Sequence, residues 1–312
     1  MTTLNNQIIV GIGEGGAPSA VRFAIDEARR TGRPVHLVHV LQLPAGEAYA
    51  LMYDGAVDSA KSLLAAAVLE AEELAGDDVV VTSELMDRGW AVEGLARRAT
   101  ENQLLVLEHR ALGRLKRVFT GSFAQGVAGR ATVPVISVPE GWTPRTDRPP
   151  VVTAAVQDPT EAPALLRAAF QEARDRNASV VVLHAWWLAS GFDETVVDRV
   201  MREEWAARSV AELEPVLAPL RSAFPGVEVT VDVRHAPPVA AVLDAAEASD
   251  LLVLGRRHHL LPLGTHLGPV ARAALGHAAS PVLVTPEVPH TAKEVARERR
   301  AGDLIDDLAP LY

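Results

Sequence analysis

Two short stretches of this sequence hold residue types that bind anions. Each begins where an apolar run ends, and each runs through basic residues to a glycine, Gly121 or Gly268. Small residues let a backbone approach phosphate oxygens closely, and a Gly-Ser pair that opens a helix adds N–H groups, a hydroxyl and the positive end of the helix dipole. The candidate anion-binding residues are Arg110, Gly121 and Ser122 in the first stretch and Gly255, Arg257 and Gly268 in the second.

Two residues weaken these candidate sites. Glu108 would place a carboxylate against bound phosphates, and two unit charges about 4 Å apart repel by about 4 kcal/mol at an effective dielectric of about 20. That repulsion approaches the roughly 4 to 8 kcal/mol with which a millimolar to micromolar ligand binds. Pro269 suits the first turn of a helix but donates no N–H group. We therefore expect the second stretch to be the better anion site.

The two stretches belong to a duplicated module. Residues 104–107 (LLVL) match 251–254, and 131–140 match 278–287, both at an offset of 147 residues. His39 and His184 correspond at an offset of 145. Matches that keep their order and spacing indicate a tandem repeat. The recurrence of a histidine near the end of the second apolar run predicts a shared packing or hydrogen-bonding role for it.

Apolar runs alternate with helical spacing in both copies. Residues 8–12 are typical of a buried parallel strand, and residues 17–31, which end at a glycine, of a helix. The alternation predicts a parallel sheet with helices on both faces. The other elements are expected at 35–40, 56–75, 79–86, 92–99, 104–107, 122–130 and 135–138, and in the second copy at 151–156, 162–174, 180–185, 196–223, 227–233, 239–246, 251–254, 269–275 and 282–285.

The positions of the prolines predict the domain boundaries. Several prolines fall between residues 139 and 150 and discourage regular structure. We expect one domain at 1–140, a linker at 141–150, a second domain at 151–289 and a charged C-terminal tail at 290–312.

The two stretches resemble the signature of universal stress proteins, Gly-x2-Gly-x9-Gly-Ser/Thr, which follows the fourth strand of that family's domain. The resemblance covers all of the chain except the tail. It implies two flavodoxin-like (adenine nucleotide alpha hydrolase-like) domains, each with a five-stranded parallel sheet and helices on both faces. It also implies that ATP binds an intact site, and that the fifth strands pair, either between the two domains or between subunits of a homodimer.

Neither copy keeps the whole signature. In the first, Glu108 and Ala111 replace the leading glycines, and Gly13 stands where family members carry an aspartate that contacts adenosine. In the second, the replacements are His258, Pro269 and Gln157. We therefore expect a stress-associated binding or regulatory module with degenerate nucleotide sites, no catalytic turnover and no required cofactor. The alternative is an ATP-binding member that uses the residual phosphate loops.

A glycine-rich segment leaves a third function open. Residues 11–16 (GIGEGG) match Gly-x-Gly-x-x-Gly between a strand and a helix, as in a dinucleotide-dependent enzyme. However, no carboxylate ends the second strand, and Glu14 lies inside the loop. A plain glycine-rich turn is the favoured interpretation.

Other constellations favour structural roles. His258, His259, His266 and His277 do not have the spacing of a zinc site, and no nucleophile elbow or metalloprotease motif is present. We expect neither a metal site nor enzymatic activity. Trp186, Trp187 and Trp205 are expected to pack together over the edge of the second sheet.

Composition narrows the class of protein further. The chain has 312 residues, no cysteine and a net charge of −10. No disulfide or thiolate metal site can form, and an acidic chain without a basic stripe is a poor ligand for nucleic acid. No signal peptide or apolar run of about 18 residues is present. We expect a cytoplasmic protein without a membrane or nucleic-acid partner.

Overall fold

The computed structural model describes residues 6–42, 48–86, 91–99, 104–109, 121–159, 162–187, 199–256 and 267–286; of residues 48–52, 121–122 and 199–200 it describes the backbone only. The predicted C-terminal tail lies outside the described residues. The described strands form one ten-stranded sheet in the order β3-β2-β1-β4-β5-β10-β9-β6-β7-β8. The strands of each half are parallel to one another.

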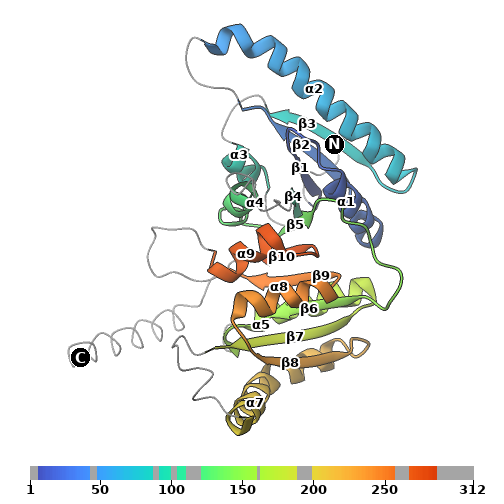
Figure 1. Cartoon of the computed structure of the whole chain (residues 1–312). Helices are drawn as coiled ribbons and strands as arrows, with labels where there is room; N and C mark the ends of the chain where they lie inside the picture. The colour runs from blue at the N-terminus through green and yellow to red at the C-terminus, as the bar shows by residue number, and fades with distance from the viewer. Residues whose placement is uncertain are drawn as a thin grey trace, which may run out of the picture.

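Each half repeats one order of elements (Figure 1). The first domain comprises β1 (Ile8–Ile12), α1 (Pro18–Thr31), β2 (Val35–Val40), α2 (Ala48–Ala75), β3 (Val81–Met86), α3 (Ala91–Arg98), β4 (Leu104–His109), α4 (Gly121–Ala128) and β5 (Val135–Pro139). The second comprises β6 (Val151–Ala155), α5 (Ala162–Arg176), β7 (Ser179–Trp186), α7 (Arg199–Ala223), β8 (Val229–His235), α8 (Pro238–Ala248), β9 (Leu251–Gly255), α9 (Pro269–His277) and β10 (Val282–Thr285). The predicted α/β fold with two five-stranded parallel sheets is confirmed.

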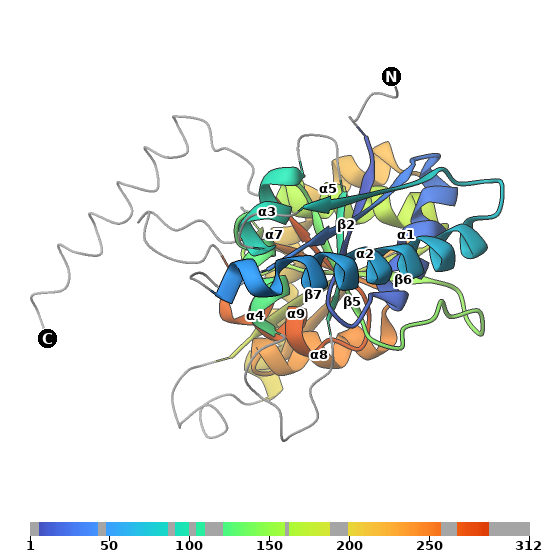
Figure 2. The same cartoon turned by 90° about the horizontal axis from the view of Figure 1, so that it is seen from above.

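Two apolar layers cover the sheet, one on each face. Buried side chains of α1, α2, α5 and α7 pack on one face, and those of α3, α4, α8 and α9 pack on the other. Both layers run without a break from one domain into the other. Figure 2 views the sheet from the α2 end, so that the first domain lies in front of the second. The strands between the two edges are mostly buried, which explains their near-continuous apolar sequences, whereas the edge strands β3 and β8 are only partly buried and carry polar residues.

The two domains meet at an antiparallel pair of strands. β5 pairs with β10, with Ile136 opposite Leu283. Beside this ladder, the side-chain amide of Gln125 in α4 donates a hydrogen bond to the carbonyl of Arg272 in α9 (3.0 Å). Parallel pairing is confined to each domain, and the antiparallel step joins two sheets into one. The β5 edge of the first sheet and the β10 edge of the second are therefore paired with each other within one chain.

A buried ionic cluster holds α1 against α5 on one face of the junction. Glu27 and Glu172 correspond in the repeat at an offset of 145. The Arg176 guanidinium lies between them, with Nη2 2.7 Å from Glu27 Oε2, and it also pairs with Glu172. Arg30 makes a second ion pair with Glu27 (2.5 Å). Burial raises the pKa of Glu172, while the nearby Arg176 opposes that shift.

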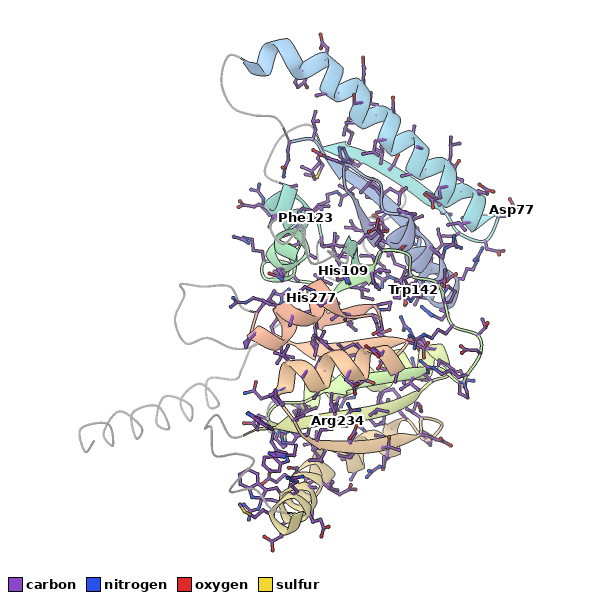
Figure 3. All side chains as sticks on the ribbon, viewed as in Figure 1. Asp77, His109, Phe123, Trp142, Arg234 and His277 are labelled. Carbon is purple, nitrogen blue, oxygen red and sulfur yellow. The ribbon has the colours of Figure 1, made fainter. Side chains whose placement is uncertain are left out.

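A buried histidine lies at the same junction. His109 ends β4, and its Nδ1 is 2.8 Å from the Ser137 hydroxyl of β5. Figure 3 places it near His277, the last residue of α9. Burial lowers the pKa of His109 to about 4, and the neighbouring His277 adds to the shift, whereas the Ala278 backbone opposes it. The His109 imidazole is therefore neutral at pH 7.

Most predicted elements appear within a few residues of their expected bounds, with one clear exception. We predicted that the long helix of the first domain begins at residue 56, but α2 begins at Ala48 and passes through Gly55. A glycine costs about 1 kcal/mol inside a helix, which is too little to end one that continues on both sides. Among the described helices, none is long and apolar enough to cross a membrane.

Candidate functional site

The second domain contains a cavity at the carboxyl ends of its strands. It has a volume of about 510 Å³ and lies where β6, β7 and β9 end and α5, α8 and α9 begin. β6 and β9 are neighbours in the sheet, but their chain connections leave in opposite directions. Ligands of open α/β sheets bind at such a switch point. The volume is within the roughly 300 to 1,000 Å³ of small-molecule sites.

Two of the predicted binding residues line this cavity. Gly255 ends β9, and Gly268 precedes α9 in an extended conformation, with φ −67° and ψ 170°. Pro269 occupies the first position of the helix, and Val270 and Ala271 of the same turn also line the cavity. The first turn of a helix presents N–H groups without partners inside the helix, next to the positive end of the helix dipole. This wall of the cavity suits an anion.

Polar side chains of both signs complete the lining. Arg256 follows Gly255, while Gln157 and Asp158 follow β6. Gln157 is the residue that stands where family members carry aspartate, and it does lie at the cavity. A cation and a carboxylate at the carboxyl ends of two neighbouring strands can bind a ligand that carries both an anionic group and hydrogen-bond donors.

The far wall of the cavity is aromatic. Trp186 and Trp187 at the end of β7 line it. The His235 ring of β8 contacts both indoles, with its centroid 4.2 Å from that of Trp186 and 5.0 Å from that of Trp187. Trp205 of α7 stacks on Trp186, with ring centroids 4.8 Å apart. The predicted tryptophan cluster is therefore confirmed, and it is only partly buried, since Trp187 and Trp205 are 39% and 38% exposed.

The equivalent position in the first domain holds a carboxylate. Glu108, the counterpart of Gly255, turns toward the start of α1, where its Oε2 accepts hydrogen bonds from the Ser19 N–H (2.7 Å) and the Ala20 N–H (3.3 Å). The Ser19 hydroxyl in turn accepts one from the Gly141 N–H (2.9 Å). The sequence predicted that the Glu108 carboxylate would repel phosphates. In the structure that carboxylate lies at the N-terminus of α1.

The glycine-rich segment of the first domain has a structural role. Gly11 leaves no room for a side chain, because a Cβ there would lie 2.6 Å from Leu107 Cδ2. The Gly16 N–H donates to the Gly13 carbonyl (3.0 Å), and Gly16 has a φ of +76°. The pyrophosphate of a dinucleotide would lie at the N-terminus of the following helix, and Glu108 fills that place. The geometry favours a plain turn over a dinucleotide site.

The paired histidines hold corresponding strand ends together. His39 Nδ1–H donates to the Ile12 carbonyl (2.7 Å), and His184 Nδ1–H donates to the Val156 carbonyl (3.1 Å). The shared hydrogen-bonding role predicted from the repeat is confirmed. In the second domain this bond fixes the strand end beside the cavity, which His184 also lines.

The remaining predicted site residues are placed only in part. Arg110 and Arg257 lie outside the described residues, as do His258, His259 and His266. Gly121 and Ser122 begin α4, and only their backbone is described. Among the described residues, no group of three or more His, Asp or Glu side chains could hold a metal ion.

Sequence reasoning missed two parts of the cavity, the start of α5 and the tryptophan wall. Ala162 and Leu165 of α5 line the cavity, and the Ala-Pro pair at 162–163 repeats the pair at 17–18. Trp186 corresponds to Leu41 at an offset of 145. Both positions follow directly from the repeat and from the rule that ligands lie beyond the carboxyl ends of strands.

The comparisons with known proteins agree with this architecture. The model of the universal stress protein family matches residues 5–139 and 151–286. A universal stress protein of Mycolicibacterium smegmatis is 27% identical over 285 residues, which cover 89% of this chain and 96% of that protein. One of Mycobacterium tuberculosis is 28% identical over 310 residues, with 90% and 95% covered.

A solved structure shares the fold over the same length. The universal stress protein of Archaeoglobus fulgidus superposes with a TM-score of 0.61 at 17% identity, covering 91% of this chain and 99% of that chain. Both the family model and the relatives extend over the two domains. The chain therefore belongs to the universal stress protein family and carries the family's domain twice in tandem.

Proposed function

We propose that this tandem protein is a binding module without catalytic turnover, in which only the second domain holds a ligand, an adenine nucleotide such as AMP or ATP. The observation that carries the proposal is the contrast at the switch points. The second domain has a cavity of about 510 Å³ beside Gly255, whereas Glu108 fills the start of α1 in the first. The first site is the degenerate one.

The lining supports a ligand with a flat ring and an anionic group. Trp186 and Trp187 offer apolar, planar surface, and aromatic pairs contribute about 0.5 to 1.5 kcal/mol beyond the area that they bury. Gly268 and the first turn of α9 offer backbone donors to an oxyanion. A nucleotide combines both features.

The role in the cell is proposed on the same basis. Binding without chemistry suits a stress-associated regulatory protein that changes its interactions when a nucleotide is bound, and we propose that it acts in the cytoplasm. The ladder of β5 and β10 supports the proposal that the two domains remain paired in solution.

Tryptophan fluorescence tests the binding proposal. Titration of the intact chain with AMP or ATP should give a saturable change, because Trp186 and Trp187 line the cavity. Trp187→Phe should remove much of that signal. The matched control is Trp142→Phe, since Trp142 packs on Phe23 of the first domain, with ring centroids 5.3 Å apart, and it should leave the change in place.

Thermal unfolding gives a second readout of the same binding. A nucleotide at about 100 times its Kd should add about 2.7 kcal/mol to the free energy of unfolding. The proposal is wrong if neither AMP nor ATP, at several millimolar, changes the fluorescence or the melting temperature of the wild-type chain.

A further inference from the structure

The starts of α1 and α5 are copies of each other. Ala17-Pro18 and Ala162-Pro163 correspond at an offset of 145, so the N–H groups of Ser19 and Ala20 have their counterparts in Ala164 and Leu165. All four belong to the first turn of a helix, where N–H groups have no acceptor within the helix. A group that binds one pair has the same geometry available at the other.

In the first domain that pair binds a carboxylate. Glu108 Oε2 lies 2.7 Å from the Ser19 nitrogen and 3.3 Å from the Ala20 nitrogen. The carboxylate comes from the neighbouring strand β4, not from α1 itself. Hydrogen bonds from backbone N–H groups to an ionised acceptor, at the positive end of a helix, are among the stronger ones in proteins. The first domain thus contains its own oxyanion at this position.

In the second domain the strand brings no carboxylate to the same place. Leu251 of β9 lies beside Val152 of β6, as Leu104 of β4 lies beside Ile8 of β1. Gly255 therefore takes the place of Glu108, and a Cβ built on it meets no atom within 4 Å. The cavity extends into this space, because Gly255 and Leu165 both line it.

We propose that an oxyanion of the bound ligand, a phosphate or a carboxylate, binds the N–H groups of Ala164 and Leu165 beside Gly255, in the place that the Glu108 carboxylate occupies in the first domain. The inference rests on the proposed function in that it concerns the ligand of the same cavity. It adds a second oxyanion position, at α5, to the one at α9. Among the described residues that line the cavity, Asp158 is acidic and Arg256 is basic.

A substitution that copies the first domain tests the proposal. Gly255→Glu should bring a carboxylate to the start of α5 and exclude the oxyanion of the ligand. Gly226→Glu is the matched control, since Gly226 is exposed, has open space for a Cβ and lies before β8, at the opposite end of that strand from His235. The probes are AMP, adenosine and inorganic phosphate, each followed by tryptophan fluorescence, and each variant is first checked for an unchanged circular dichroism spectrum.

The proposal predicts a pattern of affinities. In the wild type and in Gly226→Glu, AMP should bind at least tenfold more tightly than adenosine, and phosphate should compete with AMP. In Gly255→Glu, AMP should lose that advantage. Equal affinities of AMP and adenosine in the wild type would overturn the oxyanion position but leave the nucleotide pocket standing. An unchanged preference for AMP in Gly255→Glu would overturn it as well.

The remaining outcomes separate the two proposals. If neither AMP nor adenosine binds the wild type but phosphate does, and Gly255→Glu removes phosphate binding, the oxyanion position stands and the nucleotide proposal fails. If none of the three probes binds, both are wrong. A Gly255→Glu chain that does not fold is replaced by Gly255→Asp, whose shorter carboxylate should weaken AMP less.

Discussion

The Glu108 carboxylate both caps α1 and fills an anion position in the first domain. The Ser19 and Ala20 N–H groups lose their acceptor when it is removed. Glu108→Ala should lower the free energy of unfolding by about 1 kcal/mol, as the loss of other helix caps does. Urea unfolding measures the difference.

A conservative variant separates the hydrogen bonds of the Glu108 side chain from its charge. Glu108→Gln keeps an oxygen acceptor without the charge. It should therefore lower the free energy of unfolding by less than Glu108→Ala does. Alanine and glutamine variants that both unfold at the wild-type urea concentration would show that the two hydrogen bonds do not stabilise the domain.

His109 predicts a pH dependence of stability. Its pKa is lowered to about 4 by burial in the folded protein, whereas an exposed histidine has a pKa near 6.5. As the pH falls from about 6.5 to about 4, the unfolded chain takes up a proton that the folded chain does not, so the folded state loses up to about 3 kcal/mol. Above pH 6.5 the residue makes no pH-dependent contribution.

A non-titrating variant measures this contribution. His109→Asn keeps a polar partner for Ser137 and should lose less stability than the wild type over that pH window, when both are unfolded with urea at pH 7, 6, 5 and 4.5. Parallel profiles of the two proteins would contradict the assignment of a buried neutral imidazole.

The positions of single site residues could be predicted from the sequence, but the directions and surroundings of their side chains could not. Gly255 and Gly268 were identified from their types and positions, and both line the cavity. The direction of the Glu108 side chain could not be predicted, because it depends on α1, which is 88 to 89 residues away in sequence. Trp186 was assigned to packing, since an indole at a strand end has the same sequence signal whether or not a cavity adjoins it.

At the scale of elements, the contact of α1 with α5 depends on Arg176. Its side chain is 7% exposed and pairs with Glu27, whose side chain is 5% exposed, and with Glu172. Removing one partner of a buried ion pair leaves an uncompensated charge and costs about 3 kcal/mol. Arg176→Met should therefore destabilise the chain by about that amount in urea or thermal unfolding.

An exposed arginine provides the control for this change. Arg221 pairs with Glu214 on α7, and their side chains are 40% and 51% exposed. Exposed pairs contribute at most about 1 kcal/mol, so Arg221→Met should have a small effect. If Arg176→Met were no more destabilising than Arg221→Met, the ionic cluster would not hold α1 against α5.

Most elements could be predicted from apolar periodicity, because the inner strands are mostly buried and the helices bury one face. The start of α2 could not, since the sequence predicts a helix that begins at residue 56, and the helix begins eight residues earlier and passes through Gly55. The ionic cluster could not be predicted from the sequence either. Glu27 and Glu172 look like ordinary surface residues of two helices until the junction of the domains brings the helices together.

At the scale of the whole molecule, duplication produced a continuous sheet with two unequal switch points. The order of strands repeats, and an antiparallel step between β5 and β10 joins the copies. The repeat itself was plain in the sequence, and the family resemblance suggested pairing of the fifth strands. The sequence also indicated that the second site is the better anion site, but not that the Glu108 carboxylate binds the start of α1, because that contact joins a strand end to a helix from another part of the chain.

The number of nucleotides that bind one chain tests this central claim most directly. Isothermal titration calorimetry of the intact protein with AMP should give one site per chain, because Glu108 occupies the start of α1 and Gly255 leaves the start of α5 open. Two equivalent sites per chain, or none, would contradict the account.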